Sequence, residues 1–221
     1  METHQINKNW ITLETINDIV SNNKKIELSN ESIELVNKCR TYLDNKLATN
    51  DKPIYGINTG FGALCNTEIK ASDLEKLQRN LVMSHACGLG EEVPQEIVKL
   101  MIFLKIQGLS YGHSGIQLAT LQRLVDFYNN DIFPVVYQQG SLGASGDLAP
   151  LAHLSLPLIG LGEVNYQGKK ITGAEINKLF SWEPIKLQSK EGLALLNGTQ
   201  FMSAYGIHSL VRLKKLSTLT D

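Results

Sequence analysis

Apolar residues recur along most of this 221-residue chain at the three- and four-residue spacings of helices that bury one face. The first clear case follows Ser29, a residue type that is common at helix N-caps. The apolar positions then lie three, seven and four residues apart, at Ile33, Val36, Leu43 and Leu47. This pattern predicts a helix that begins directly after Ser29.

A second helix is predicted by a start signal and a stop signal. Ser72-Asp73-Leu74-Glu75 has the form of a capping box, in which serine and glutamate satisfy the first backbone N–H groups of a helix. The helix that follows carries Ser84 and His85 near its end. Gly88 is its expected stop, because glycine readily adopts the left-handed conformation found at helix ends.

Similar signals predict five more helices. They begin near Pro94 (with Val98, Met101, Leu104 and Ile106), after Gly115 (ending before Pro134), at Asp147 (the apolar-rich residues 148–161), at the capping box of Thr172 and Glu175, and at Thr199 (with Tyr205, Leu210 and Leu213). One β-hairpin is predicted over residues 163–171, with Gln167-Gly168 at its turn. The expected fold class is mostly α-helical with a small β-hairpin at the edge, and nothing in the length requires more than one domain.

Composition narrows the classes of partner and compartment. The formal net charge of -1 offers no electrostatic reason for binding nucleic acid or an anionic membrane. Cys39, Cys65 and Cys87 are odd in number and lack the spacing of a zinc site, which indicates reduced intracellular thiols and no metal. The polar N-terminus lacks the apolar segment of a secretory signal, and residues 148–161 are too short to span a bilayer. We therefore expect a cytoplasmic protein.

The candidate chemistry lies in the glycine-rich stretch around Ala144-Ser145-Gly146. Gly146 has no Cβ, so its backbone can enter bends that are closed to other residues. In such a bend, its amide nitrogen can reach the carbonyl carbon of Ala144. Ring closure with loss of one water, followed by loss of the Ser145 hydroxyl as a second water, would give a five-membered ring with an exocyclic methylene. That group is a strong electrophile of a kind that no ordinary side chain supplies.

The triplet by itself leaves other interpretations open. Ser145 could be a hydrolase nucleophile, although the second glycine comes one residue early for the Gly-x-Ser-x-Gly elbow. The loop could also hold phosphate at a helix N-terminus, although it lacks the Lys-Ser/Thr end of a P-loop and the complete dinucleotide fingerprint. On the triplet alone, a plain loop, a phosphate site and a cyclised triplet have about equal weight.

Four sequence blocks change that balance. They are Tyr55-Gly56-Ile57-Asn58-Thr59-Gly60-Phe61-Gly62, Asn80-Leu81-Val82-Met83-Ser84-His85-Ala86, the signature from Gly140 to His153, and Lys190-Glu191-Gly192-Leu193-Ala194-Leu195-Leu196-Asn197-Gly198-Thr199. Together, and in this order, they resemble the aromatic amino acid ammonia-lyases. In that family the Ala-Ser-Gly triplet becomes a 4-methylidene-imidazol-5-one (MIO) group, so the resemblance implies that Ala144, Ser145 and Gly146 form the cofactor and that no external cofactor is needed.

The resemblance also implies roles for residues outside the triplet. Tyr55 lies in the glycine-rich loop of residues 53–66, whose composition suits either a mobile lid or an ordinary surface turn, and it matches the lid tyrosine that takes part in proton transfer. Asn197, otherwise a turn residue, matches the amide that contacts the MIO group and the substrate. Ser84 and His85 match the two residues that contact the substrate side chain, and this polar pair resembles the histidine ammonia-lyase branch of the family.

The function implied is elimination of ammonia from L-histidine to give trans-urocanate, in a homotetramer whose sites are shared between subunits. A phenylalanine or tyrosine ammonia-lyase, an MIO aminomutase and a non-catalytic remnant stay as alternatives. Gln117, Tyr137 and Cys87 depart from the family pattern and loosen the choice of substrate. Residues 1–221 are expected to be the N-terminal, MIO-bearing region of a lyase. On its own, this region should be inactive and should leave apolar residues of the last predicted helix partly exposed.

Overall fold

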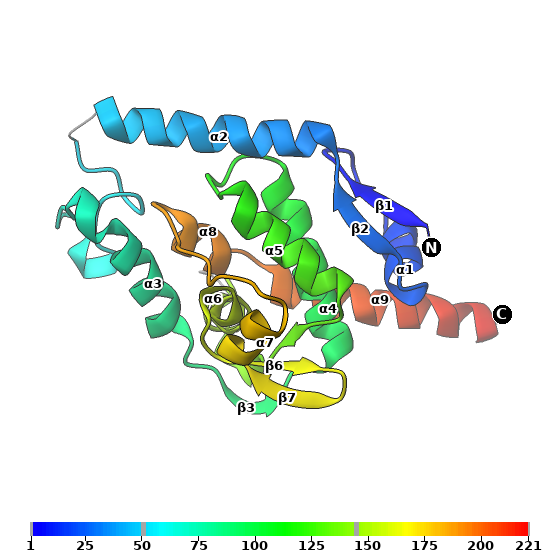
Figure 1. The fold of residues 1–221 in the computed structure, drawn as a ribbon. Helices are drawn as coiled ribbons and strands as arrows, with labels where there is room; N and C mark the ends of the chain where they lie inside the picture. The colour runs from blue at the N-terminus through cyan, green and yellow to red at the C-terminus, as the bar shows by residue number, and fades with distance from the viewer. Residues whose placement is uncertain (1, 50–51, 144–145, 221) are drawn as a thin grey trace.

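The computed structural model describes residues 2–49, 52–143 and 146–220, and within these ranges helices dominate (Figure 1). The α-helices are α1 (Leu13–Ser21), α2 (Asn30–Thr49), α3 (Leu74–His85), α4 (Gln95–Ser110), α5 (Leu118–Asn129), α6 (Leu148–Ser155), α7 (Gly173–Leu179), α8 (Glu191–Leu196) and α9 (Gln200–Thr220). Short 3-10 helices are η1 (Gly62–Leu64), η2 (Ala71–Asp73) and η3 (Leu156–Ile159). The predicted fold class is confirmed.

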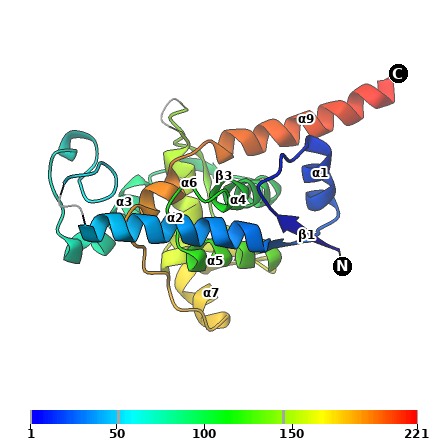
Figure 2. The ribbon, with the colours of Figure 1, turned by 90° about the horizontal axis from the view of Figure 1, so that it is seen from above.

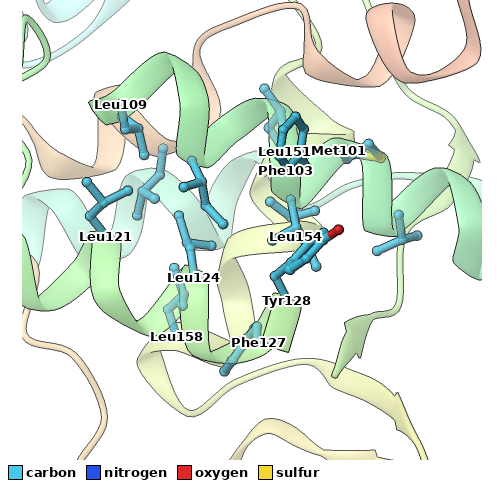
Figure 3. Packing of buried hydrophobic residues seen from close by; sticks show 14 of the residues in the cluster. Met101, Phe103, Leu109, Leu121, Leu124, Phe127, Tyr128, Leu151, Leu154 and Leu158 are labelled. Carbon is cyan, nitrogen blue, oxygen red and sulfur yellow. The ribbon is translucent and has the colours of Figure 1, made fainter. Parts of the chain in front are cut away.

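Helix α4 forms the centre of the core. Most of its residues are buried, which is the behaviour of a helix that is apolar on all sides. It packs against α5 on one side and α9 on another. Figure 3 shows its side chains in one cluster with those of α5 and α6, and Leu158 of η3 lies beside Leu124 of α5. The residues labelled there are Met101, Phe103, Leu109, Leu121, Leu124, Phe127, Tyr128, Leu151, Leu154 and Leu158.

Three small sheets border the helices. The strands are β1 (Thr3–Ile6), β2 (Lys25–Leu28), β3 (Leu89–Glu92), β4 (Phe133–Pro134), β5 (Tyr137–Gln139), β6 (Glu163–Tyr166) and β7 (Lys169–Thr172). β1 and β2 pair in parallel, β3 pairs with β5 antiparallel, and β4, β6 and β7 form an antiparallel sheet. The β6–β7 hairpin confirms the prediction, and its turn residues Gln167 and Gly168 have φ of 50° and 73°, as a tight two-residue turn requires. The other strands were not predicted, because two to four residues show no clear alternation.

Several helix starts are confirmed. The Ser32 N–H donates to the Ser29 hydroxyl over 3.2 Å, so Ser29 caps α2 as predicted. Thr172 and Glu175 form the predicted capping box at α7. Helices α4 and α5 also occupy their predicted stretches, with Pro94 at the N-cap of α4.

The predicted capping box of α3 is wrong. The chain already turns in η2 over Ala71–Asp73, and the extended residue that a capping box needs at its N-cap is Lys70, with φ of -62° and ψ of 147°. Asp73 precedes α3 without a side-chain capping bond. The predicted stop is also wrong, because α3 ends at His85 and its C-cap is Ala86. Gly88 belongs to the following segment, where its N–H donates to His153 Nε2 over 3.0 Å.

Helix α9 begins directly after Thr199, as predicted, and extends away from the body of the fold (Figure 2). Its later apolar residues are exposed, with Leu210 at 54% and Leu213 at 59%, which confirms the exposure expected for this stretch. In the part of the chain that the structure describes, no helix combines the length and the apolar character needed to cross a membrane.

Candidate active site

The loop that leads to the triplet is tightly packed where it leaves β5. Gly140 has φ of +136°, and a Cβ placed there would lie 2.9 Å from Ala149 Cβ and 3.2 Å from Gly88 Cα. Any larger residue would therefore push the loop away from α6 and from the segment after α3. The close contact between Gly140 and Gly88 brings the segment that follows α3 next to the triplet loop.

Gly146, the last residue of the triplet, also needs to be glycine. Its φ is +95°, and a Cβ there would lie 2.8 Å from the carbonyl oxygen of Gly198. Its N–H donates to the Gly143 carbonyl over 3.0 Å. The chain is thus bent at Gly146 and pressed against the segment between α8 and α9. Ala144 and Ser145 lie outside the described residues, so their predicted roles stay predictions.

Asp147 ties the triplet loop to two helices. It is fully buried, and its N–H donates to the Gly198 carbonyl over 2.7 Å. One carboxylate oxygen accepts from the Ser141 hydroxyl at 2.7 Å and the other accepts from the Met202 N–H at 3.0 Å. Asp147 occupies the N-cap position of α6, as predicted, but its side chain makes no capping bond there and caps the first turn of α9. This aspartate therefore fixes the C-terminal side of the triplet relative to α9.

Asn197 ends α8 beside this loop. Its N–H donates to Leu193 O over 3.0 Å, and its carbonyl accepts from Lys105 Nζ at 3.3 Å. Lys105 comes from α4 and is only 2% exposed. Burial lowers the pKa of Lys105 to about 7, and the nearby charge of Asp147 opposes this shift. The sequence reasoning missed Lys105, although a lysine between the apolar residues Leu104 and Ile106 was a visible signal.

Ser84 and His85 occupy the last turn of α3. His85 Nδ1 lies 2.8 Å from the Leu81 carbonyl oxygen, and the Ser84 hydroxyl lies 3.1 Å from the same oxygen and 3.2 Å from His85 Nδ1. A ring nitrogen beside a carbonyl must donate, so we assign the proton of the neutral ring to Nδ1. Nε2 is then an acceptor. His85 is half-buried and Ser84 is exposed, so both can meet a ligand.

The chain after His85 is held by His153. His153 Nε2 accepts from the Gly88 N–H, and its ring lies edge-on to Tyr137 at 5.0 Å between centroids. Burial lowers the pKa of His153, which favours the neutral ring that this contact requires.

Tyr55 is 58% exposed, and its ring packs edge-on against Phe61 at 5.9 Å between centroids. Its loop rests on α8, because a Cβ at Gly56 would lie 2.7 Å from Leu193 Cδ2. The structure thus brings the Tyr55 loop to the helix that ends at Asn197. The described contacts of the Tyr55 ring join it to its own loop and not to Gly146 or His85, so its catalytic role stays a prediction.

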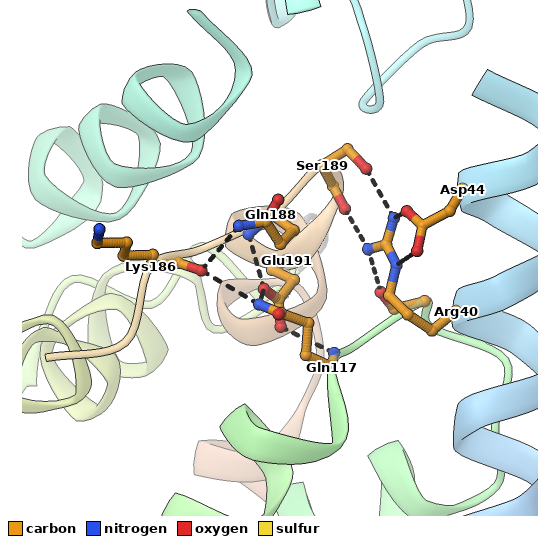
Figure 4. Close-up of polar contacts among 8 residues, drawn as sticks. Arg40, Asp44, Gln117, Lys186, Gln188, Ser189 and Glu191 are labelled. Carbon is orange, nitrogen blue, oxygen red and sulfur yellow. Dashed lines mark hydrogen bonds and ion pairs between the residues drawn. The ribbon is translucent and has the colours of Figure 1, made fainter. Parts of the chain in front are cut away.

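A buried polar cluster at the start of α8 was also missed (Figure 4). Glu191 is fully buried and accepts from the Gln117 N–H at 2.9 Å, from the Thr120 hydroxyl at 2.7 Å and from the Gln188 N–H at 2.7 Å. The side-chain amide of Gln117 also bonds the carboxylate, which gives a structural role to one of the departures from the family pattern. The partners lie up to 74 positions from Glu191, a separation that local patterns do not reveal.

Arg40 fixes the segment before α8 from the other side (Figure 4). Its guanidinium donates to the Ser189 carbonyl at 2.9 Å, to the Ser189 hydroxyl at 2.8 Å and to the Gly115 carbonyl at 2.8 Å, and it pairs with Asp44. Helix α8, which carries Asn197 at its end, is therefore anchored to α2 and α5 before it reaches the site.

The buried lysine leads to a pH-dependent prediction. The pKa of Lys105 is about 7 in the folded protein against an ordinary 10.5, so between these values the unfolded chain binds a proton that the folded chain lacks. Stability therefore rises with pH in this window, by at most about 1.4 kcal/mol per pH unit. Urea unfolding of the full-length protein at several pH values from about 7 to about 9 should show this rise. The Lys105→Met variant should lack it, and parallel pH curves for the two proteins would contradict the prediction.

Comparison with known proteins places the sequence and the fold in a family. Residues 11–221 match the family described as aromatic amino acid lyase. The histidine ammonia-lyase of Deinococcus radiodurans is 46% identical over 88% of this chain and 37% of its own length. The crystal structure of histidine ammonia-lyase from Trypanosoma cruzi superposes with a TM-score of 0.88 at 34% identity, over 98% of this chain and 42% of that one. The Pantoea agglomerans phenylalanine aminomutase gives a TM-score of 0.89 at 30% identity, over 98% and 41%.

The chain belongs to the aromatic amino acid lyase family. It spans less than half of the length of the curated relatives cited here. Both the resemblance in the four sequence blocks and the expected fold are therefore confirmed.

Proposed function

We propose that the protein is an ammonia-lyase that converts L-histidine to trans-urocanate and ammonia, with an MIO group formed from Ala144, Ser145 and Gly146. The observation that carries the proposal is Gly146, bent at φ +95° against Gly198 in a chain of the aromatic amino acid lyase family. Because these relatives are named histidine ammonia-lyase, we choose histidine over other aromatic amino acids as the substrate.

The residues around the triplet fit an MIO group. The Gly146 nitrogen must reach the carbonyl carbon of Ala144, and a residue without a Cβ allows this bend. The structure leaves no room for a Cβ at Gly146, and the Asp147 N–H bonds the Gly198 carbonyl directly after it. When formed, the group supplies an electrophilic methylene for the substrate's amino group. The N-terminus of α6 follows the triplet, and the positive end of its helix dipole favours negative charge at this place.

The chain's own residues bind and orient the substrate in this proposal. His85 Nε2 accepts the N–H of the substrate imidazole, while the Ser84 hydroxyl donates or accepts beside it. The Asn197 amide orients the substrate next to the triplet. Tyr55 moves a proton at the substrate β-carbon from its loop above α8.

The oligomer and the compartment are part of the same proposal. We infer a cytoplasmic homotetramer that acts on a small amino acid and needs neither nucleic acid nor a membrane. Leu210, Leu213, Leu216 and Leu219 of α9 are exposed and offer an apolar surface that another part of the lyase or another subunit can cover.

The direct test is a substrate screen of the full-length protein. Histidine, phenylalanine and tyrosine are supplied separately, and the absorbance of each unsaturated acid is followed, with chromatography of the β-amino acids in parallel. We expect histidine to react fastest and to give urocanate. Faster turnover of phenylalanine or tyrosine would contradict the substrate, and accumulation of a β-amino acid would favour an aminomutase.

The His85→Phe variant should lose activity on histidine by about tenfold to a hundredfold, because one buried hydrogen bond to the substrate is worth about 1 to 3 kcal/mol. Turnover of phenylalanine should fall less, since that substrate has no N–H to satisfy. The measurement is kcat/KM for both substrates. His208→Phe, at a half-buried histidine of α9, is the matched control and should change neither value much. An equal loss on both substrates would show that His85 does not read the imidazole.

A further inference from the structure

Lys105 is placed where a charged side chain is costly. It lies in α4 between apolar residues of the core, and its fractional exposure is 2%. A buried lysine is retained only where its amine has a partner. The partner here is the carbonyl of Asn197, 92 positions away along the chain and 3.3 Å from Nζ.

The Asn197 carbonyl needs such a donor. It comes at the C-terminus of α8, where the last carbonyls of a helix have no N–H group of their own helix to accept from. The next carbonyl, that of Gly198, accepts from the Asp147 N–H at 2.7 Å. Two successive carbonyls are therefore held by different parts of the fold, one by α4 and one by the residue that follows the triplet.

This short segment is the surface against which Gly146 bends. A Cβ at Gly146 would meet the Gly198 carbonyl oxygen at 2.8 Å and the Gly198 nitrogen at 3.2 Å. A shift of the Asn197–Gly198 backbone by a few tenths of an ångström would therefore change the room in which the triplet folds. Among the contacts of the described residues, the bond from Lys105 joins this segment to the core and opposes such a shift.

We propose that Lys105 is a positioning residue for closure of the ring in the triplet, acting through the Asn197–Gly198 backbone. This inference rests on the proposed function. In the step, the Gly146 nitrogen bonds to the Ala144 carbonyl carbon, and that oxygen leaves as water with the hydrogens of the Gly146 and Ser145 nitrogens. The Ser145 hydroxyl then leaves as a second water with the Ser145 α-hydrogen. No oxidant or reductant is required.

The contact does not depend on the charge of the lysine. Both the ammonium and the neutral amine carry N–H groups that can donate to the Asn197 carbonyl. Asp147 offsets part of the cost of the charged form, because it is the carboxylate that interacts with Lys105. Removal of the amine, and not its neutralisation, is therefore the change that tests the role.

The test compares Lys105→Met with Lys99→Met in the full-length protein. Lys99 is a second largely buried lysine of the same helix, and it pairs with Asp131 at 2.7 Å and with Asn23 at 3.1 Å, outside the site. Each protein is synthesised in a cell-free system, and the native fraction is sampled for intact mass over time. The readout is the rate at which the mass falls by two water molecules, with a urea midpoint as the measure of stability.

We expect ring closure in Lys105→Met to be slower by about tenfold, as loss of one buried hydrogen bond predicts. Lys99→Met should be destabilised while closing its ring at the wild-type rate. If Lys105→Met yields no native fraction, the test uses Lys105→Gln, which keeps an N–H donor on a shorter side chain. Slower ring closure in Lys105→Gln than in the wild type then supports the role of Lys105. A rate within about twofold of wild type in the folded variant, or an equal slowing in Lys99→Met, overturns the role of Lys105. Absence of mass loss in the wild type itself overturns the proposed function instead, and with it this inference.

Discussion

Replacement of Ser145 by alanine in the full-length protein should abolish both the loss of two waters from the chain and the turnover of histidine. Without the hydroxyl there is no second water to lose and no exocyclic methylene to form. The activity should fall by about a thousandfold or more, which corresponds to roughly 4 kcal/mol of transition-state stabilisation. Intact mass of the native protein gives the first readout, and urocanate absorbance gives the second.

The control for this variant is Ser155→Ala. Ser155 is buried in α6, and its hydroxyl donates to the Leu151 carbonyl of the same helix at 2.7 Å. Its loss should leave both the mass change and the activity in place. A wild-type protein that is folded and active but has lost no water would show that the lyase works without this chemistry. Full activity in Ser145→Ala would show the same.

Replacement of Glu191 by alanine should lower the free energy of unfolding by about 3 to 5 kcal/mol, because several buried donors lose their acceptor at roughly 1 to 3 kcal/mol each. The carboxylate accepts from the Gln117 and Gln188 backbones and from Thr120, and all of these donors would lose their partner together. Each unsatisfied buried donor is itself costly. The start of α8 would loosen, and with it the segment that ends at Asn197.

Urea or thermal unfolding of the full-length protein measures the effect. Glu191→Gln should be milder, because the amide keeps one acceptor oxygen and the shape of the side chain. Glu14→Gln is the surface control, since Glu14 lies on the outside of the fold, where it pairs with Lys214, and its replacement should change the midpoint little. Equal midpoints for wild type and Glu191→Ala would contradict the view that Glu191 anchors α8.

Much of the secondary structure was predictable because its causes are local. The bond from the Ser32 N–H to Ser29, the capping box of Thr172 with Glu175, and the turn at Gln167-Gly168 each join residues at most three positions apart. The capping box expected at Ser72 does not form, although Ser72 and Glu75 are suitable residue types. Ser72 lies in the 3-10 helix η2 and therefore lacks the extended backbone that an N-cap needs. A local signal is reliable only where the neighbouring backbone permits it.

The candidate site also has features that the sequence predicted and features that only the fold revealed. The four blocks identified the triplet, Ser84, His85 and Asn197 as candidate site residues through the family that they resemble. The fold then brings Gly146 against Gly198, and Gly88, in the segment after α3, against Gly140. The roles of Asp147 and Lys105 were harder to foresee. Asp147 has the residue type and the position of an N-cap for α6, yet its side chain accepts from the Met202 N–H of α9. The sequence could not reveal this bond, because Met202 comes within reach only in the folded chain.

The sequence alone determined the lyase family, the helical class and the candidate site residues. It could do so because helix caps, turns and the triplet each consist of residues that are neighbours in the chain. The partners of the buried charges follow from the packing of the chain. Lys105 meets Asn197 across 92 positions, Glu191 meets Gln117 across 74 and Asp147 meets Met202 across 55. A buried charge bonds whichever donor or acceptor the core places within about 3 Å of it, and that neighbour exists only once α4, α8 and α9 are packed together.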